Sequence, residues 1–379
     1  TTFSVTVVDV QPPTLLASAV SFTVECNANS ANALSSWLAT NGGAAASDAC
    51  GPVTWSNNFT ALNGSCGATG AATVVFTATD TSGNKATTTA TFTVVDTLAP
   101  TIVAPATSIT LESSGASTTA AISAWLASNG GASATDSCST VTWSNNYTGL
   151  TDGCGATGTA TVIFTAKDAC GNYSKSQATI TVVDTTAPTL TAASDLTVQS
   201  DGAGNLAALN TWLASNGGAT GTDIGGLVTW TNNFASVSDG CGTTGSATVT
   251  FTATDECGNA ATTTATFTIK DTIAPTIHTA AANQTVESDG AGNVSALSAW
   301  LANFGGATAS DVGSAVTMSH NYVAGSLSDG CGATGAVTVT FTATDACGNA
   351  SSSTATFTIV DTTKPVLTSN VRNISPNER

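Results

Sequence analysis

The chain has 379 residues, of which only 8% are charged, yet acidic residues outnumber basic ones 24 to 7 and leave a net charge of -17. This balance argues against binding to nucleic acid or to anionic membranes and is compatible with divalent cations. No run of apolar residues reaches the length of a membrane-spanning helix, so we expect no membrane span in this segment.

A repeat of about 88 residues organises the chain. The string Asp-Thr-x-Ala-Pro recurs at Asp96–Pro100, Asp184–Pro188 and Asp271–Pro275. Each copy has about the size of an Ig-type sandwich. The period predicts a closing strand of a preceding repeat at 1–8, Ig-like repeats 1 to 4 at 9–96, 97–184, 185–271 and 272–361, and the start of a following repeat at 362–379. The segment therefore looks cut from a longer array.

The first half of repeat 3 predicts a strand, a turn and a helix. Residues 189–198 alternate loosely and indicate a first strand, and the turn at 200–205 carries helix-capping residues. Leu206, Leu209, Trp212 and Leu213 then follow at helical spacing. We expect a short amphipathic helix that lies on the sheet and ends at the Gly-Gly pair 217–218; a bulged strand is the alternative.

The second half of repeat 3 predicts strands. Residues 227–230 alternate, with Trp230 inward, and 247–255 and 261–270 alternate strictly, with Thr outward and apolar residues inward. Thr-rich outer faces suit β-structure and stay soluble without charge. The predicted fold class is all-β: tandem Ig-like β-sandwich repeats, each with one short inserted helix, stacked into an elongated rod.

The motif Thr-Ala-Thr-Asp-x-x-Gly-Asn, followed by Thr-x-Thr-Phe-Thr-Val-x-Asp-Thr-x-Ala-Pro, resembles hyalin-repeat (HYR) and bacterial Ig-like families across all four repeats. The insert with Trp-Leu-Ala-Ser-Asn-Gly-Gly is similar to repeats of giant cell-surface adhesins of Bacteroidota, including gliding-motility adhesins. The resemblance implies an Ig-like fold and names no ligand.

The ten cysteines fall into four columns of the repeat. Pairing inside a repeat would join Cys154 to Cys170, but a strand of roughly 30 Å separates them, whereas a disulfide needs Cα atoms within about 7 Å. Pairing between successive repeats leaves only Cys50 and Cys331 over. It predicts the disulfides Cys26–Cys138, Cys66–Cys170, Cys154–Cys257 and Cys241–Cys347. Both pairings stay open here, and either one places the chain in an oxidising compartment.

Most acidic residues also fall into columns. The Asp that ends each closing strand should meet the Asp of the Asp-x-x-Gly-Asn turn in the next repeat. Clustered carboxylates with few basic partners favour Ca²⁺, which takes six to eight oxygen ligands. We expect Ca²⁺ at the junctions, and in related bacterial Ig-like stalks such junctions bind it; simple turn capping is the alternative. The expected metal ligands are Asp96 with Asp168, Asp184 with Asp255, and Asp271 with Asp345.

The linker Asp-Thr-x strings resemble the O-glycosylation sequon of Bacteroidota. The resemblance implies Thr97, Thr185, Thr272 and Thr362 as acceptors, and a plain linker is the alternative.

No recurring Ser/His/Asp set and no phosphate-cradling motif is found, so we expect no enzyme. The sequence predicts a structural stalk segment of a long secreted or cell-surface adhesin, located extracellularly. Its stapled rod would display an adhesive tip or transmit force in attachment or gliding. Its partners would be neighbouring repeats and an unknown surface, glycan or protein ligand. Two alternatives are a self-assembling fibre formed by strand complementation and an array of carbohydrate-binding modules appended to a secreted enzyme.

Overall fold

The computed structural model describes residues 1–328 and 330–366. The chain divides into two compact units, the first made of 1–186 and 224–227 and the second of 187–223 and 228 onward. Within the described residues, no helix is long and apolar enough to cross a membrane. The expected start of a following repeat at 362–379 lies outside the described residues from 367 on.

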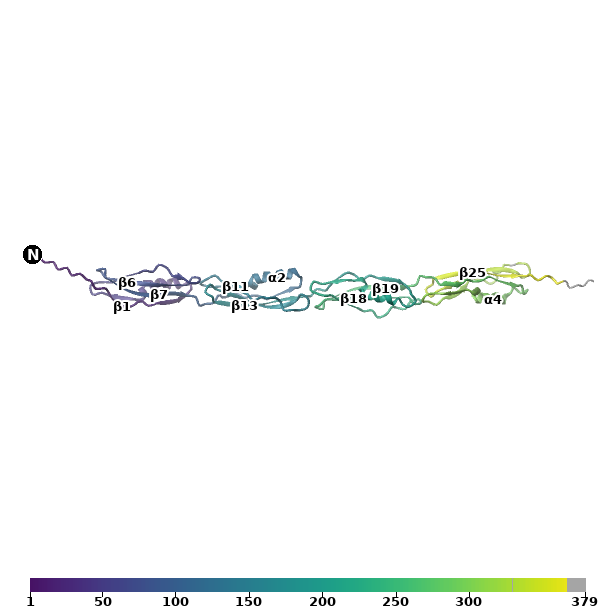
Figure 1. Ribbon diagram of the computed structural model, residues 1–379, viewed down its shortest axis with the longest axis horizontal. Helices are drawn as coiled ribbons and strands as arrows, with labels where there is room; N and C mark the ends of the chain where they lie inside the picture. Colours follow the sequence, from purple (N-terminus) through teal and green to yellow (C-terminus); the bar gives the residue numbers. More distant parts are fainter. Residues whose placement is uncertain (329, 367–379) are drawn as a thin grey trace, which may run out of the picture. The chain divides into compact units, whose positions relative to one another are not determined.

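A long antiparallel hairpin forms the centre of each repeat (Figure 1). In repeat 1 it joins β6 to β7 in a sheet of order β2-β7-β6-β4, and the short β5 pairs with β6. The first strand of the sheet, β2, runs parallel to β7. Repeat 1 contains β1 (Thr14–Ala17), β2 (Phe22–Glu25), α1 (Ser30–Ala39), β3 (Ala45–Ser47), β4 (Thr54–Asn57), β5 (Asn63–Gly64), β6 (Gly70–Thr79) and β7 (Lys85–Val95).

Repeat 2 has the same arrangement, with the sheet order β11-β12-β13-β9. Its elements are β8 (Thr101–Ala104), β9 (Ile109–Glu112), α2 (Ala116–Ala127), β10 (Ser133–Thr135), β11 (Thr142–Asn145), β12 (Gly158–Lys167) and β13 (Tyr173–Val183).

The second unit repeats this order twice, in the sheets β15-β19-β18-β17 and β21-β25-β24-β23. Repeat 3 contains β14 (Thr189–Leu190), β15 (Leu196–Gln199), α3 (Leu206–Ala214), β16 (Gly221–Thr222), β17 (Thr229–Asn232), β18 (Gly245–Thr254) and β19 (Ala260–Lys270). Repeat 4 contains β20 (Thr276–Thr279), β21 (Gln284–Glu287), α4 (Val294–Ala302), β22 (Thr308–Ser310), β23 (Thr317–His320), β24 (Gly335–Thr344) and β25 (Ala350–Val360).

The expected fold class is confirmed: nearly all of the regular structure is β, in repeated sandwich-like domains with one short α-helix each. The strand expected at 189–198 is wrong in one respect, because it is broken in two. β14 pairs with β16 in a separate two-stranded sheet, whereas β15 joins the main sheet beside β19. The chain thus crosses between the two layers, and this crossing gives the sandwich its second sheet.

The capping residues expected before the helix of repeat 3 do not cap it. Asn205 precedes α3 with a left-handed φ of 54° and makes no side-chain cap hydrogen bond. Its Nδ2 instead donates to the carbonyl oxygen of Gln199 at 2.8 Å, and Asp201 Oδ1 accepts from the N–H of Ala203 and of Asn205. These side chains therefore brace the loop that leads from strand to helix.

The core of each repeat forms where the helix meets the central hairpin. In repeat 1 the Trp37 ring packs edge-on against Phe76, with the centroids 5.2 Å apart. Gly42 follows the helix with φ +66°, and a Cβ there would lie 3.1 Å from both Ala19 and the Phe76 ring. Only glycine allows this approach without strain, so the Gly-Gly pair both ends the helix segment and closes the core.

Candidate functional site: repeat junctions

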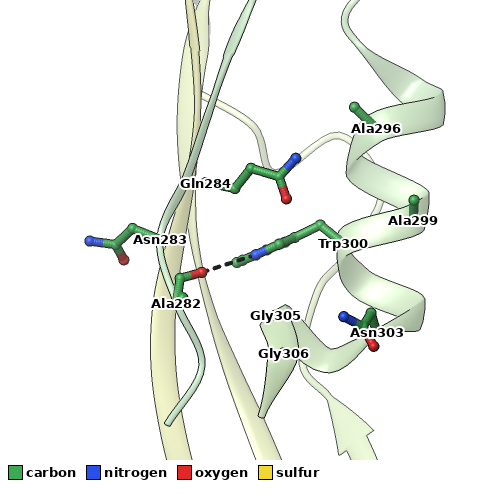
Figure 2. Close-up of a pocket in the computed structure, with 9 residues that line it drawn as sticks. All are labelled: Ala282, Asn283, Gln284, Ala296, Ala299, Trp300, Asn303, Gly305 and Gly306. Carbon is green, nitrogen blue, oxygen red and sulfur yellow. Dashed lines mark hydrogen bonds between the residues drawn. The ribbon is translucent and has the colours of Figure 1, made fainter. Parts of the chain in front are cut away.

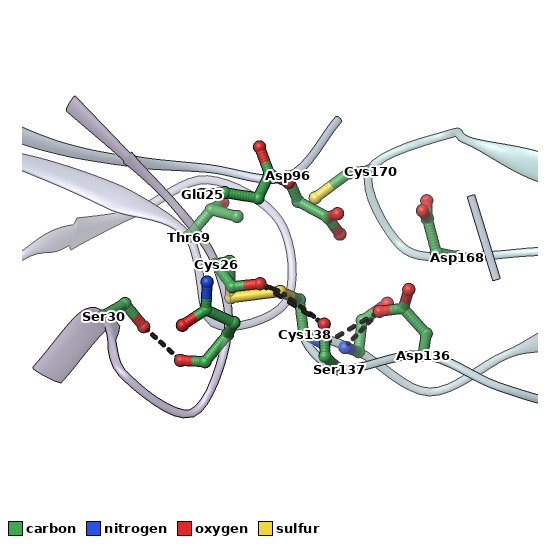
Figure 3. The surroundings of a disulfide bond; sticks show 12 residues. Glu25, Cys26, Ser30, Thr69, Asp96, Asp136, Ser137, Cys138, Asp168 and Cys170 are labelled. Carbon is green, nitrogen blue, oxygen red and sulfur yellow. Dashed lines mark hydrogen bonds between the residues drawn. A yellow bond between two sulfur atoms is a disulfide. The ribbon is translucent and has the colours of Figure 1, made fainter. Parts of the chain in front are cut away.

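A disulfide joins Cys26 at the end of β2 to Cys138 in the loop after β10 (Figure 3). Their Cα atoms are 5.8 Å apart, and both residues are buried. Cys26 N–H donates to Val95 O at 2.7 Å, and Cys138 N–H donates to Asp136 Oδ1 at 2.9 Å. The backbone N–H of each cysteine is thereby bonded within its own repeat, on either side of the crosslink.

A second disulfide in the same junction joins Cys66 to Cys170, with a Cα separation of 5.1 Å. The backbone also meets directly, since Ala68 N–H donates to Cys138 O at 2.9 Å. Gly67 lies at this contact with φ +54°, where a Cβ would be 2.6 Å from that carbonyl oxygen. Repeats 1 and 2 are thus crosslinked at two separate points.

The junction between repeats 3 and 4 carries one disulfide, between Cys241 and Cys347, with a Cα separation of 5.1 Å. The positions that correspond to Cys26 and Cys138 are Ser200 and Gly313. A Cβ on Gly313 would lie 2.8 Å from the Cα of Gly202. The backbone therefore approaches closely where the other junction has its second crosslink.

The remaining cysteines divide into two groups. Cys154 and Cys257 belong to different units, so their pairing stays a prediction. Cys50 and Cys331 are exposed free thiols, and they are the two residues for which the between-repeat pairing leaves no partner. The pKa of the Cys50 thiol is raised, and the negative charge of Asp9 is the largest cause.

Carboxylates gather beside the junction, but their set differs from the expected one. One carboxylate oxygen of Asp96 lies within 4.8 Å of one of Asp136, while Asp168 acts on Asp96 as a further nearby negative charge. In the second unit, Asp271 and Asp345 do come together within 4.8 Å, and Asp311 is the third member. Asp184 and Asp255 belong to different units, so that pair stays a prediction.

Asp136 and Asp311 are therefore members of these clusters that were not among the predicted metal ligands. These residues stand just after the short strands β10 and β22. Their alignment with Asp48 was visible in the sequence as a recurring column. Their approach to the linker Asp depends on the two-stranded sheet, which the sequence did not predict.

The turn aspartates cap their own turns. Asp168 Oδ1 accepts from the N–H of Gly171 and of Asn172, and Oδ2 accepts from Asn172 Nδ2 at 2.8 Å. Burial alone would raise the pKa of Asp168, but the hydrogen bonds from Asn172, Gly171 and Cys170 outweigh it and lower the pKa. Turn capping and participation in an acidic cluster thus coexist in one carboxylate, which has acceptor capacity beyond these bonds.

One carboxylate oxygen in the junction has no partner. Asp96 Oδ2 is fully buried and makes no hydrogen bond, and Asp9 Oδ2 at the beginning of repeat 1 is in the same situation. Burial, followed by the charges of Asp136 and Asp168, raises the pKa of Asp96. A buried, unpaired carboxylate oxygen costs free energy, and a bound cation would compensate that cost.

The residue at the end of the parallel edge strand holds each linker threonine; it is a glutamate in repeats 1, 2 and 4 and Gln199 in repeat 3. Glu112 Oε1 accepts from Thr185 N–H at 2.7 Å, and Oε2 accepts from the Thr185 hydroxyl at 3.1 Å. No pattern in the sequence predicted this role for the glutamate column. All four threonines expected as glycosylation acceptors donate their hydroxyl protons in this way: Thr97 to Glu25, Thr185 to Glu112, Thr272 to Gln199 and Thr362 to Glu287.

A shallow groove of about 360 Å³ runs between α4 and the beginning of β21 in repeat 4 (Figure 2). The Trp300 indole spans it, and its Nε1 donates to Ala282 O at 3.1 Å. Gln284, Asn303 and alanine side chains complete the walls, and none of the lining groups is titratable. The groove therefore offers hydrogen-bonding amides around an indole and no acid or base for catalysis.

No protein-family model and no curated protein matches the chain. Among solved structures, extracellular cadherin domains 1–5 of protocadherin gamma B2 are 12% identical over 93% of this chain and 82% of that chain, with a TM-score of 0.30. Domains 1–4 of protocadherin gamma B7 are 12% identical over 90% of this chain and 99% of that chain, with a TM-score of 0.32. Drosophila N-cadherin EC1-4 is 10% identical over 78% of this chain and 84% of that chain, with a TM-score of 0.23. TM-scores this low do not indicate a function, and the resemblance to hyalin repeats stays a prediction.

Proposed function

We propose that the chain is a structural stalk segment of a long secreted or cell-surface adhesin, which displays an adhesive tip or transmits force in surface attachment or gliding. The observation that supports this most is covalent: Cys26–Cys138 and Cys66–Cys170 crosslink successive repeats at two points. Domains joined by a bare linker normally move relative to one another. Two crosslinks at separate positions resist both bending and twisting at a junction.

The same architecture makes the stalk a series of covalent clamps. Pulling force entering one repeat passes to the next through disulfides as well as through the linker. Cys154–Cys257, in the junction between repeats 2 and 3, would continue the series. Cys50 and Cys331 would bond to further repeats with the corresponding cysteines. In this function the chain needs no catalytic centre, and its extracellular location follows from the oxidising conditions that disulfides require.

Ca²⁺ would reinforce the junctions. We propose that it is held by Asp96, Asp136 and Asp168 in the first unit and by Asp271, Asp311 and Asp345 in the second. Asp184 and Asp255 would act in the same way in the junction between repeats 2 and 3. The buried, unpartnered Asp96 Oδ2 supports the fit, since Ca²⁺ prefers carboxylate and carbonyl oxygens.

The crosslinks are tested by peptide mapping without reduction, followed by atomic force microscopy of the full chain. We expect a Cys154–Cys257 peptide and straight particles that bend only after reduction. A Cys154–Cys170 peptide, or particles that bend freely before reduction, would contradict the stalk. Mass photometry distinguishes the stalk from a self-assembling fibre. A polymer of the isolated chain that forms in a concentration-dependent way would favour the fibre.

Calcium binding is tested by calorimetric titration of the chelator-treated chain with Ca²⁺ and with Mg²⁺. We expect Ca²⁺ to bind and to raise Tm, because a ligand that binds only the folded state stabilises it. Asp136→Asn and Asp311→Asn should each remove a site, whereas Asp239→Asn, on an exposed loop, should not. Equal titrations for the three variants would rule out these clusters.

We also propose the four linker threonines as O-glycan acceptors. Glycosylation of Thr185 would replace the hydroxyl proton that it donates to Glu112. The assignment is tested by comparing the intact mass of protein from the native source with that of bacterially expressed protein, both for the unaltered chain and for Thr185→Val. If the mass difference is the same with and without the substitution, Thr185 carries no glycan.

A further inference from the structure

Repeat 2 carries an aromatic and basic patch on the outer face of its central hairpin. Tyr173, Lys175 and Gln177 alternate outward along β13, because Ser176 and Ala178 between and beyond them are buried. Lys167 on β12 lies directly opposite Tyr173 in the register of the hairpin. The four residues Lys167, Tyr173, Lys175 and Gln177 are called the Tyr173 patch below.

The ring of Tyr173 is open to solvent. It is 58% exposed, which is unusual for so large a side chain in a chain with few exposed aromatic residues. The ammonium of Lys175 lies 5.3 Å from the ring centroid, a cation–π arrangement. The lysine thus lies over one face of the ring, and the two form one composite surface.

The other repeats lack this surface at the same register positions. The residue pair that corresponds to Lys167 and Tyr173 is Thr79 and Lys85 in repeat 1, Thr254 and Ala260 in repeat 3, and Thr344 and Ala350 in repeat 4. The position of Lys175 is occupied by Thr87, Thr262 and Ser352. A plain hydroxyl-rich face is therefore sufficient for folding, and the Tyr173 patch is an addition specific to repeat 2.

The charges of the chain and of the Tyr173 patch restrict the kind of ligand that the patch can bind. The patch holds two of only 7 basic residues in a chain with 24 acidic ones. Such a chain repels dense polyanions such as nucleic acid. Two neighbouring ammonium groups on an uncharged, Thr-rich face nevertheless attract a single carboxylate, because charge-assisted hydrogen bonds are the strong ones.

We propose that the Tyr173 patch binds an acidic sugar unit of a surface glycan. The apolar C–H face of the sugar ring would pack on the face of the Tyr173 ring opposite Lys175. Its carboxylate would accept hydrogen bonds from Lys167 and Lys175, and its hydroxyl groups would pair with Gln177 and the neighbouring threonines. This function goes beyond a stalk, since repeat 2 would itself contact a surface while the crosslinks carry the load.

The test uses the full chain and three probes: trigalacturonate, its uncharged counterpart galactotriose, and the peptide triglutamate. Binding is followed by calorimetry and by NMR of the ligand at low salt. We expect trigalacturonate to bind with a Kd of about 1 mM, at least about tenfold more tightly than either other probe. Raising the salt concentration should weaken it, because the contact is exposed.

The variants exchange patch residues for those of the sibling repeats, so folding is preserved. Lys167→Thr, Lys175→Thr and Tyr173→Ala should each weaken trigalacturonate binding by about fivefold or more. Lys85→Thr, which removes an exposed lysine from the corresponding hairpin of repeat 1, is the matched control and should change nothing. Circular dichroism melting checks that all four variants fold.

Three results would overturn the proposal. They are absence of trigalacturonate binding, equal binding to the chain and the patch variants, and equal affinity for triglutamate, which would identify a carboxylate site without sugar recognition. None of them bears on the disulfide map or on bending, so failure of the patch and failure of the stalk are distinguishable.

Discussion

The side-chain Nδ2 of Asn172 donates a hydrogen bond to the backbone carbonyl oxygen of Asp96, 3.1 Å away and 76 residues earlier in the chain. The same amide donates to Asp168 Oδ2 at 2.8 Å. One amide thus connects the capped turn of repeat 2 to the linker that precedes the repeat. Asn84 and Asn349 make the same contact with Asp9 and Asp271.

Replacing this amide should loosen the linker. Asn172→Ala removes both hydrogen bonds, so we expect a loss of about 1–3 kcal/mol in the free energy of unfolding. Urea denaturation measures it. Thr89→Ala, on an exposed strand face, should cost less than about 0.5 kcal/mol; equal losses for the two variants would contradict the role of Asn172.

The contact between Gly67 and Cys138 can be isolated by a comparison within the chain. Gly67→Ala forces a left-handed φ and places a Cβ 2.6 Å from Cys138 O, whereas Gly332, with φ +63°, has nothing within 4 Å of its added Cβ. In both variants the alanine must adopt a left-handed conformation, which costs roughly 1–2 kcal/mol. We expect Gly67→Ala to lower Tm clearly more than Gly332→Ala in differential scanning calorimetry. Matching decreases would mean that the junction tolerates the added methyl group.

Low pH should weaken the hydrogen bonds between the linker threonines and the glutamates that hold them. The hydrogen bond from Thr185 N–H is the largest cause that lowers the pKa of Glu112, and Thr362 N–H acts in the same way on Glu287. A lowered folded-state pKa means that the stabilisation is present above the unfolded pKa of about 4.3 and is lost as the pH falls through the folded value.

The pH effect has a natural control in repeat 3, where Gln199 occupies the glutamate position and holds Thr272. Amide hydrogen exchange of Thr185 and Thr272 between pH 6 and pH 3, corrected for intrinsic rates, measures it. Protection of Thr185 should fall, and protection of Thr272 should change less. Glu112→Gln should make Thr185 behave like Thr272; if Thr185 in that variant still loses protection at low pH, another group controls the linker.

The thiol of Cys50 should react slowly with alkylating agents. The negative charge of Asp9 is the largest cause that raises its pKa, and only the thiolate is nucleophilic. Asp9→Asn should lower the pKa and accelerate alkylation by iodoacetamide near pH 8, as followed by mass spectrometry. Asp152→Asn, distant in sequence, serves as the control; acceleration in both variants would point to net charge instead of the local carboxylate.

The sequence by itself determined the repeat period, the strand alternation, the short helix around Trp212 and the columns of cysteine and acidic residues. These features are periodic and local, because neighbouring residues decide which side chains face the core. The between-repeat cysteine pairing was one of two options, since column spacing constrains but does not choose partners.

Tertiary structure alone decided which side chains meet across long distances in the chain. Asp136 lies against Asp96 because the broken first strand forms a second sheet, and Glu112 reaches Thr185 because β9 runs parallel to β13. Parallel pairing joins segments that are far apart in sequence. The register of such a pair is set by packing of the whole repeat, so no local pattern around Glu112 could have revealed its partner.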